Sequence, residues 1–147
     1  MTTLYQTEAT ATGGRTGSAR SADGALAVTL VTPKELGGAG GDGTNPEQLF
    51  AAGYAACFLG ALKVVASKAK VRLGEEATVT VTVGIGPRDD GQGFGLTVAL
   101  RANLPGLDPE VARDLVHQAD VVCPYSHLAR NGVSVALSHS AETVQVA

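Results

Sequence analysis

Two cysteines in contrasting settings are the residues of this 147-residue chain that are best suited to chemistry. Cys57 lies in the apolar run 55–59, which is typical of the middle of a buried helix, whereas Cys123 directly precedes Pro124. Because proline fits the first position of a helix, Cys123 is expected to cap a short helix, where the helix dipole favours a thiolate. The two thiols could form a redox pair, or they could be inert core residues, since free cysteine is often buried.

A buried thiol becomes a nucleophile only when a neighbouring group stabilises its thiolate. Burial raises a thiol pKa, so Cys57 needs a cation from elsewhere in the fold. Arg15, with glycines at 13, 14 and 17, is one candidate, because a guanidinium stays charged and can bind a carboxylate while it faces a sulfur. Glu47 is a candidate carboxylate. Each also has a simpler interpretation, Arg15 as a solvated hairpin residue and Glu47 as an acid in the first turn of a helix.

Other site chemistries find little support in the sequence. His117 and His127 flank Cys123, but the chain lacks the closely spaced Cys or His pairs that indicate a metal site, so we expect none. The glycine-rich segment 37–43 is not followed by the lysine of a phosphate-binding loop, which predicts an ordinary surface loop. No serine lies in a Gly-x-Ser-x-Gly motif, which argues against a hydrolase.

The elements that must position these residues can be predicted from the pattern of the chain. Asn45 is a helix cap and Pro46 a first helical residue, so a helix is expected from there to about Lys70, with Cys57 near its centre. Strands are expected at 4–12, 15–21, 25–31, 78–83, 94–100, 133–137 and 143–146, and further helices at 108–120 and 124–130. Without βαβ alternation, this order predicts one α+β domain over 1–147, with antiparallel sheet.

Composition narrows the possible partners and compartments. The formal net charge is −3 and the eleven Lys and Arg residues are scattered, so nucleic-acid binding is not expected. The longest stretch without charge or proline, 48–62, is shorter than the about 18 residues of a membrane span, so no membrane association is expected. The N-terminus lacks a signal-peptide pattern, and two cysteines are too few for a disulfide framework, which favours the cytoplasm.

Three motifs together resemble the organic hydroperoxide resistance proteins, the peroxidase branch of the OsmC/Ohr family. They are Gly-Gly-Arg at 13–15, the long segment 36–58 from Leu-Gly-Gly-Ala-Gly-Gly to Ala-Ala-Cys-Phe, and Val-Cys-Pro-Tyr-Ser at 122–126. Their order and spacing extend the resemblance over essentially the whole chain. It implies an OsmC-like fold, in which antiparallel sheets wrap around long central helices in an intertwined homodimer.

The resemblance also implies a function, a thiol-dependent peroxidase that reduces organic hydroperoxides to alcohols. Cys57 matches the peroxidatic cysteine, which becomes a sulfenic acid, and Cys123 matches the resolving cysteine, which forms a disulfide with it. Arg15 and Glu47 match the polar pair that activates the thiolate. No bound cofactor or metal is implied, and the electrons are expected from an external dihydrolipoyl dithiol on lipoylated proteins.

Substrate contacts are expected from the apolar side chains of the helix around Cys57. These are Phe50, Tyr54, Phe58 and Leu59, which would favour alkyl or fatty-acid hydroperoxides over hydrogen peroxide. Two alternatives stay open: an OsmC-type protein with weak peroxidase activity, and a non-enzymatic redox sensor or carrier of an apolar ligand.

The spacing of Glu47 and Cys57 predicts a site shared between two chains. Ten residues on a continuous helix correspond to a rise of about 15 Å and a rotation of about 80° from alignment. If both residues act on one thiolate, either the helix is broken between them or Glu47 acts on the Cys57 of a partner subunit.

Overall fold

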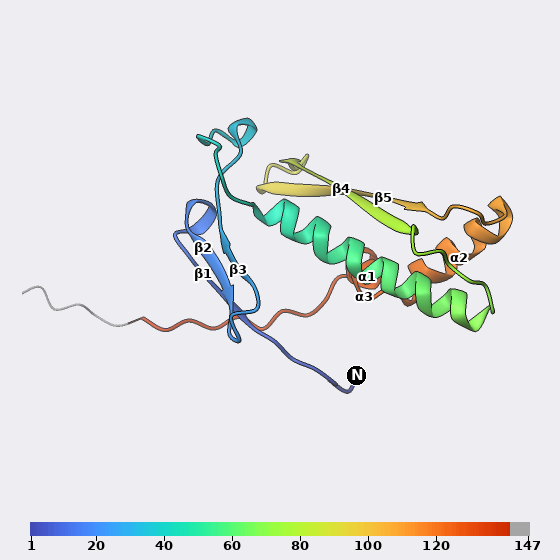
Figure 1. The fold of residues 1–147 in the computed structure, drawn as a ribbon. Helices are drawn as coiled ribbons and strands as arrows, with labels where there is room; N and C mark the ends of the chain where they lie inside the picture. The colour runs from blue at the N-terminus through green and yellow to red at the C-terminus, as the bar shows by residue number, and fades with distance from the viewer. Residues whose placement is uncertain (142–147) are drawn as a thin grey trace, which may run out of the picture.

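Two antiparallel sheets and three helices make up the computed structural model, which describes residues 1–141 (Figure 1). The first sheet has the order β1-β2-β3, formed by β1 (Ala9–Thr12), β2 (Ser18–Ser21) and β3 (Ala27–Thr29). A short 3-10 turn, η1 (Gly14–Thr16), connects β1 to β2, so Arg15 belongs to the turn and not to the strand predicted from residue 15. A second 3-10 turn, η2 (Lys34–Leu36), leads into the glycine-rich segment.

The long helix α1 (Pro46–Lys68) follows this segment and is continuous over 23 residues. Its start is as predicted: the side chain of Asn45 accepts a hydrogen bond of 2.8 Å from the backbone N–H of Gln48, and Pro46 occupies the first turn. Just before the helix, the backbone N–H of Thr44 donates a hydrogen bond of 2.9 Å to the carbonyl of Thr29. This bond fastens the N-terminal end of α1 to the first sheet.

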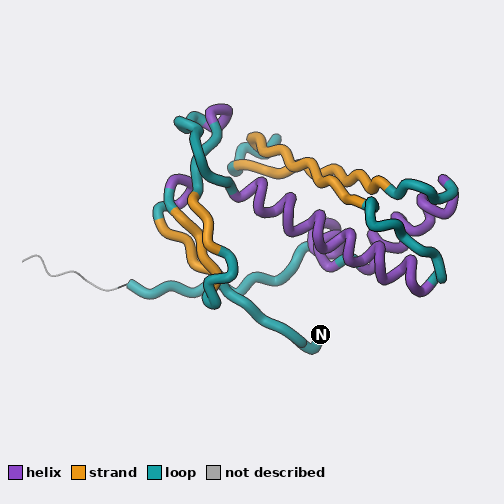
Figure 2. Tube along the Cα trace, viewed as in Figure 1, coloured by secondary structure: helices purple, strands orange, loops and turns teal. Residues whose placement is uncertain are grey.

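A hairpin and a pair of helices pack against α1 (Figure 2). The hairpin consists of β4 (Thr78–Pro87) and β5 (Phe94–Asn103), which pair antiparallel over their full lengths. The helices are α2 (Pro109–Val122) and α3 (Pro124–Asn131), separated by Cys123 alone. The predicted helices and hairpin are confirmed, and the architecture is α+β with antiparallel sheets, as expected.

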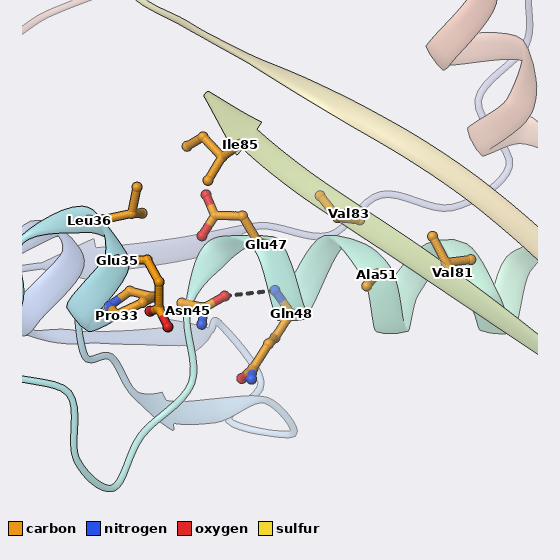
Figure 3. A pocket seen from close by; sticks show the side chains of 10 residues that line it. All are labelled: Pro33, Glu35, Leu36, Asn45, Glu47, Gln48, Ala51, Val81, Val83 and Ile85. Carbon is orange, nitrogen blue, oxygen red and sulfur yellow. Dashed lines mark hydrogen bonds between the residues drawn. The ribbon is translucent and has the colours of Figure 1, made fainter. Parts of the chain in front are cut away.

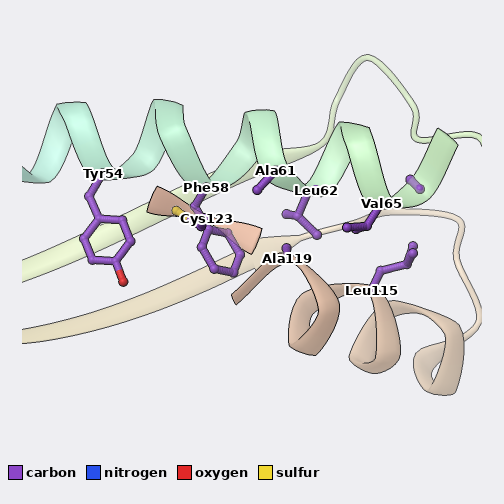
Figure 4. Packing of buried hydrophobic residues seen from close by; sticks show 9 residues of the cluster. Tyr54, Phe58, Ala61, Leu62, Val65, Leu115, Ala119 and Cys123 are labelled. Atoms are coloured by element: carbon purple, nitrogen blue, oxygen red, sulfur yellow. The ribbon is translucent and has the colours of Figure 1, made fainter. Parts of the chain in front are cut away.

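The core lies where α1, α2 and the hairpin meet (Figure 4). Phe58, Leu62 and Val65 lie on the side of α1 that meets Ala119 and Leu115 of α2, and Leu62 is fully buried. Cys123 is also fully buried in this cluster. The resolving-cysteine candidate is therefore held by the core itself, not by a loop at the surface.

The two strands expected near the C-terminus are not observed among the described residues. Residues 133–137 form no strand: they are an exposed extended segment, in which Val133, Val135 and Leu137 have no strand to pair with among residues 1–141. Their alternating pattern is typical of a strand, but no strand lies beside them in the described part of the chain. The strand expected at 143–146 lies outside the described residues.

The helix α1 is longer than the uncharged stretch 48–62 considered in the sequence. By length and composition alone this helix could cross a membrane, with a mean hydropathy of 1.8 over its most apolar window. Core helices of soluble proteins pass the same test, and α1 is the element around which this core forms. Only a third of that window is buried, however, so much of the helix surface is uncovered in the single chain.

Candidate functional site

The two cysteines lie next to each other although 66 residues separate them in sequence. Their Sγ atoms are 3.7 Å apart and share a hydrogen bond, and neither takes part in a disulfide. Sulfur atoms in a disulfide are about 2 Å apart, so a small movement of one side chain would bring the pair to bonding distance. Cys123 is fully buried, whereas Cys57 is only partly buried.

The turn between α2 and α3 places Cys123 against α1. The N–H of Cys123 donates to the carbonyl of Ala119 at 2.9 Å, and its own carbonyl accepts from the N–H of His127 at 3.0 Å. Cys123 therefore ends α2 and caps α3 at once, with Pro124 in the first helical position. The predicted cap position of Cys123 is confirmed. The structure shows in addition that its side chain is buried in the core.

The environment of Cys57 disfavours a thiolate within this single chain. Burial raises the pKa of the Cys57 thiol, the backbone N–H of Tyr125 at the start of α3 lowers it, and the adjacent Cys123 thiol raises it further. The net pKa is above the ordinary value for a cysteine. Sequence reasoning assigned the helix start to Cys123 and missed that the N–H of Tyr125 at this helix start reaches Cys57; the Cys-Pro-Tyr run was the available signal.

Arg15 and Glu47 form the second cluster of predicted site residues. Arg15 Nη2 donates to Glu47 Oε1 at 2.6 Å and Nη1 donates to Oε2 at 3.0 Å, a two-pronged ion pair across 32 residues of sequence. Hydrogen bonding from Arg15 holds the pKa of Glu47 below its ordinary value against the opposing effect of burial. This ion pair joins the 3-10 turn that carries Arg15 to the first turn of α1. It also holds the guanidinium in one position beside the carboxylate.

The structure does not bring the four predicted catalytic residues into one cluster within a single chain. Glu47 lies in the first turn of α1 and Cys57 near its middle, and the helix is unbroken between them. Ten residues of continuous helix span about 15 Å, far beyond the roughly 4 Å of an ion pair. The sequence-based alternative of a broken helix is therefore wrong, and the site consists of a thiol pair and an Arg–Glu pair set apart along α1.

Two adjoining cavities lie at the Arg–Glu end of α1. One, of about 430 Å³, is lined by Glu47, and the other, of about 470 Å³, by Arg15. They share Glu35, Leu36 and Ile85 as lining residues. In Figure 3, Glu47 points between α1 and β4 toward Ile85. Val81, Val83 and Phe94 add further apolar wall, which the sequence pattern did not distinguish from ordinary strand residues.

The predicted substrate contacts lie elsewhere in the single chain. Phe50 and Tyr54 form an aromatic cluster with Tyr125, with ring centroids 5.6 to 6.0 Å apart. Phe58 is buried in the core, and Leu59 lines a separate cavity with Lys63. None of the four lines the two cavities beside Arg15 and Glu47, so their contact with substrate stays a prediction.

Metal-ligating side chains do not gather around the cysteines in the described part of the chain, and the expectation of no bound cofactor stays a prediction. Among residues 1–141, no three His, Cys, Asp or Glu side chains come close enough to share a metal ion. His117 and His127 are exposed on either side of Cys123 and form no such group with it in the described part of the chain. The chemistry that the geometry offers is sulfur chemistry, with one accessible thiol and one enclosed partner.

Known proteins resemble this chain in sequence and in structure over most of its length. Residues 38–138 match the family described as OsmC-like protein. An organic hydroperoxide resistance protein of Xanthomonas axonopodis pv. citri is 55% identical over 135 residues, which cover 92% of this chain and 94% of that protein.

Solved structures give the same result. The crystal structure of an organic hydroperoxide resistance protein from Elizabethkingia anophelis has a TM-score of 0.83 at 53% identity and covers 89% of this chain and 92% of its own. The OhrB protein of Bacillus subtilis has a TM-score of 0.80 at 42% identity, covering 88% and 93%. Because the family match spans residues 38–138 and the relatives are more than 50% identical over about nine tenths of the chain, this protein belongs to the organic hydroperoxide resistance proteins of the OsmC/Ohr family.

Proposed function

We propose that the chain is a thiol-dependent peroxidase that reduces organic hydroperoxides to alcohols. The observation that carries this proposal is the pairing of a partly exposed Cys57 with a fully buried Cys123, 3.7 Å apart. An accessible thiol can meet a peroxide, and an enclosed second thiol can react with the product before another peroxide does. The names of the relatives, which refer to organic hydroperoxides, support the same substrate class.

The reaction can be written with each bond assigned. The Cys57 thiolate attacks one oxygen of the peroxide, an S–O bond forms, the O–O bond breaks, and the departing alkoxide takes a proton and leaves as the alcohol. Cys123 then attacks the sulfur of the sulfenic acid. An S–S bond forms, the S–O bond breaks, and the oxygen leaves as water. The buried position of Cys123 favours this second step because it keeps the thiol beside Cys57 and away from competing oxidants.

The proposed active site is composite, with Arg15 and Glu47 of one subunit acting on the partner's Cys57. In the single chain the pKa of Cys57 is raised, so a cation must reach it from outside. The Arg–Glu pair of the same chain is too far along the unbroken helix to supply that charge. Positive charge beside a thiol favours the thiolate, and the carboxylate of Glu47 keeps the guanidinium in a fixed orientation.

A homodimer is supported by the surface that the single chain leaves uncovered. Ala52, Ala56 and Gly60, spaced four residues apart along α1, are exposed and form a stripe of small residues. Such a stripe lets two helices approach closely. The exposed apolar residues of β5 and of segment 133–137 would be covered by the same partner, and that segment would gain the strand neighbour that it lacks here.

The cavities beside Arg15 and Glu47 suit the organic part of the substrate. Leu36, Ile85 and Phe94 give them apolar walls, and each buried CH₂ group of a substrate contributes about 0.8 kcal/mol. Hydrogen peroxide has no such group. In the composite site these walls would lie close to the partner's Cys57, together with the predicted contacts from the helix that carries it.

The disulfide must be reduced before the next turnover, and we propose an external dihydrolipoyl dithiol on a lipoylated protein as the donor. One thiol of the dithiol attacks a sulfur of the disulfide and releases the first cysteine; its second thiol then attacks the mixed disulfide, forms the cyclic disulfide of the reagent and releases the second cysteine. Cys57 is the less buried of the two cysteines, so we expect the reductant to attack its sulfur. A cytoplasmic location, where dithiol systems keep such cysteines reduced between turnovers, is part of the proposal.

Single-turnover oxidation tests the proposal and the two cysteine roles. Purified Cys57→Ser should consume no organic hydroperoxide, whereas Cys123→Ser should consume about one equivalent and stop as a sulfenic acid, because its resolving thiol is missing. Mass spectrometry of the products, after trapping with a sulfenic-acid reagent, identifies the oxidised residue. Steady turnover of the wild type with a dihydrolipoyl compound distinguishes an enzyme from a sensor or carrier. Identical behaviour of the two variants would contradict the roles.

A further inference from the structure

Four polar side chains connect the three helices that surround Cys123, and we call them the polar chain: Tyr54, Ser126, Asp120 and Arg130. The hydroxyl oxygens of Tyr54 on α1 and Ser126 on α3 are 2.8 Å apart in a buried hydrogen bond. Arg130 on α3 donates from Nε to Oδ2 of Asp120 on α2 at 3.0 Å, and its Nη2 lies 2.8 Å from the same oxygen. The proposed peroxidase chemistry uses none of these contacts.

The two contacts of the polar chain involve an ionised carboxylate and a fully buried hydroxyl. Burial opposes the ionised form of Asp120, but hydrogen bonding from Arg130 holds its pKa below the ordinary value, so Asp120 is ionised near neutral pH and accepts from Arg130. The side chain of Ser126 is fully buried, and losing its partner Tyr54 would leave a costly unpaired polar group.

The polar chain encloses the turn on which Cys123 lies. Asp120 is three residues before Cys123 and Ser126 three residues after it, so the chain bridges α2 to α3 across the cysteine and then ties both to α1. The only side-chain hydrogen bond of Cys123 in the described part of the molecule is to Cys57. Its distance from Cys57 therefore depends on how the turn is held against α1.

We propose that the polar chain consists of positioning residues that keep Cys123 within reach of Cys57. The inference rests on the proposed redox role of the two thiols. It adds that the polar chain determines how readily Cys57 and Cys123 form a disulfide. The polar chain acts through Cys123 and not on the peroxide. Its loss would let the α2–α3 turn move relative to α1, and a displacement of about 1 Å can slow a reaction between two groups on the order of a hundredfold.

The test is the equilibrium between the Cys57–Cys123 dithiol and its disulfide in mixtures of oxidised and reduced dithiothreitol. Each exchange transfers two electrons and two protons between the protein and the reagent. Tyr54→Phe removes one hydroxyl and should lower the equilibrium constant for disulfide formation about tenfold, which makes the reduction potential about 30 mV less negative. Alkylation of free thiols followed by mass spectrometry gives the fraction of disulfide at each ratio.

A second variant keeps the test valid if the buried substitution disturbs folding. Arg130 is 66% exposed, so Arg130→Ala leaves no cavity, and a partly exposed ion pair predicts a smaller decrease of about threefold. Arg130→Lys should restore most of the equilibrium constant for disulfide formation, because lysine again places a positive charge beside Asp120. Arg113→Ala is the matched control: it removes another arginine ion pair of α2, with Glu110, that has no connection to the thiols, and it should leave the potential unchanged.

The outcomes separate this inference from the proposed function. The potential is measured without any peroxide, so a shift in Tyr54→Phe and Arg130→Ala supports positioning even if the chain proves to consume no hydroperoxide. An unchanged or more negative potential in both variants, or an equal shift in Arg113→Ala, overturns the inference even if the wild type is an active peroxidase. In an active enzyme, slower resolution should also raise the share of Cys57 that is oxidised to sulfinic acid.

Discussion

Mixing two inactive variants provides a direct test of the composite site. Cys57→Ser removes the peroxidatic thiol, and Glu47→Ala removes the carboxylate that orients Arg15 at 2.6 and 3.0 Å. If Glu47 serves the partner's Cys57, one site of each heterodimer combines an intact Cys57 with an intact Glu47, while the other site lacks both. The variants should therefore complement each other in the heterodimer although neither is active alone.

The expected activity follows from the symmetry of the dimer. Random exchange of equal amounts gives heterodimers as about half of all dimers, and each has one working site of two, so recovery should approach about a quarter of wild-type activity. If Glu47 served its own Cys57, both sites of the heterodimer would lack one residue and recovery would be near zero. The unbroken α1, about 15 Å long between the two residues, is the reason to expect the first result.

The assay is steady consumption of an alkyl hydroperoxide with a dihydrolipoyl reductant, before and after a cycle of dilution and mixing. Differently tagged chains and native mass spectrometry measure how much heterodimer has formed. A Cys57→Ser chain mixed with a Cys57→Ser, Glu47→Ala chain is the control, since no site in that mixture has a thiol. Abundant heterodimer without recovered activity would refute the shared site and the helix argument behind it.

Three further predictions concern single positions. A Cβ added at Gly53 would lie 3.0 Å from the Tyr125 hydroxyl, so Gly53→Ala should lower peroxidase activity about tenfold by moving this ring. Tyr125→Phe in the same chain should restore the activity, and an unchanged activity in Gly53→Ala would argue against the contact. Because the folded-state pKa of Glu47 is lowered, its ion pair stabilises the protein above the unfolded pKa of about 4.3 and is lost as pH falls through the folded value. The difference in unfolding free energy between wild type and Glu47→Gln, measured with urea, should thus be constant near neutral pH and vanish in acid, and a difference that persists there would contradict the assignment. Leu62 is fully buried, so Leu62→Ala should cost about 2–5 kcal/mol of unfolding free energy, and a loss below about 1 kcal/mol would mean that this part of the core is loosely packed.

The local elements of this protein could be predicted from the sequence because short-range rules decide them. Asn45 and Pro46 specify where α1 begins, Pro124 specifies the start of α3, and the alternating pattern of 78–83 and 94–100 specifies a hairpin. The prediction of a strand at 133–137 was wrong for the single chain, because a strand needs a neighbour and local pattern cannot supply one. Both cysteines, Arg15 and Glu47 were candidates by residue type and setting, and the family resemblance gave each a role that stays a prediction.

Only the tertiary structure decided how these residues are grouped. The core places Cys123 against Cys57 across 66 residues of sequence, and the ion pair joins Arg15 to Glu47 across 32, contacts that depend on how the elements pack. The burial that raises the pKa of Cys57, and the Tyr125 N–H that opposes it, likewise come from elements brought together by folding. The same holds for the polar chain around Cys123 and for the cavities beside Arg15. Local sequence determines where a helix begins, but a long-range contact exists only where separate elements bury their apolar faces against one another.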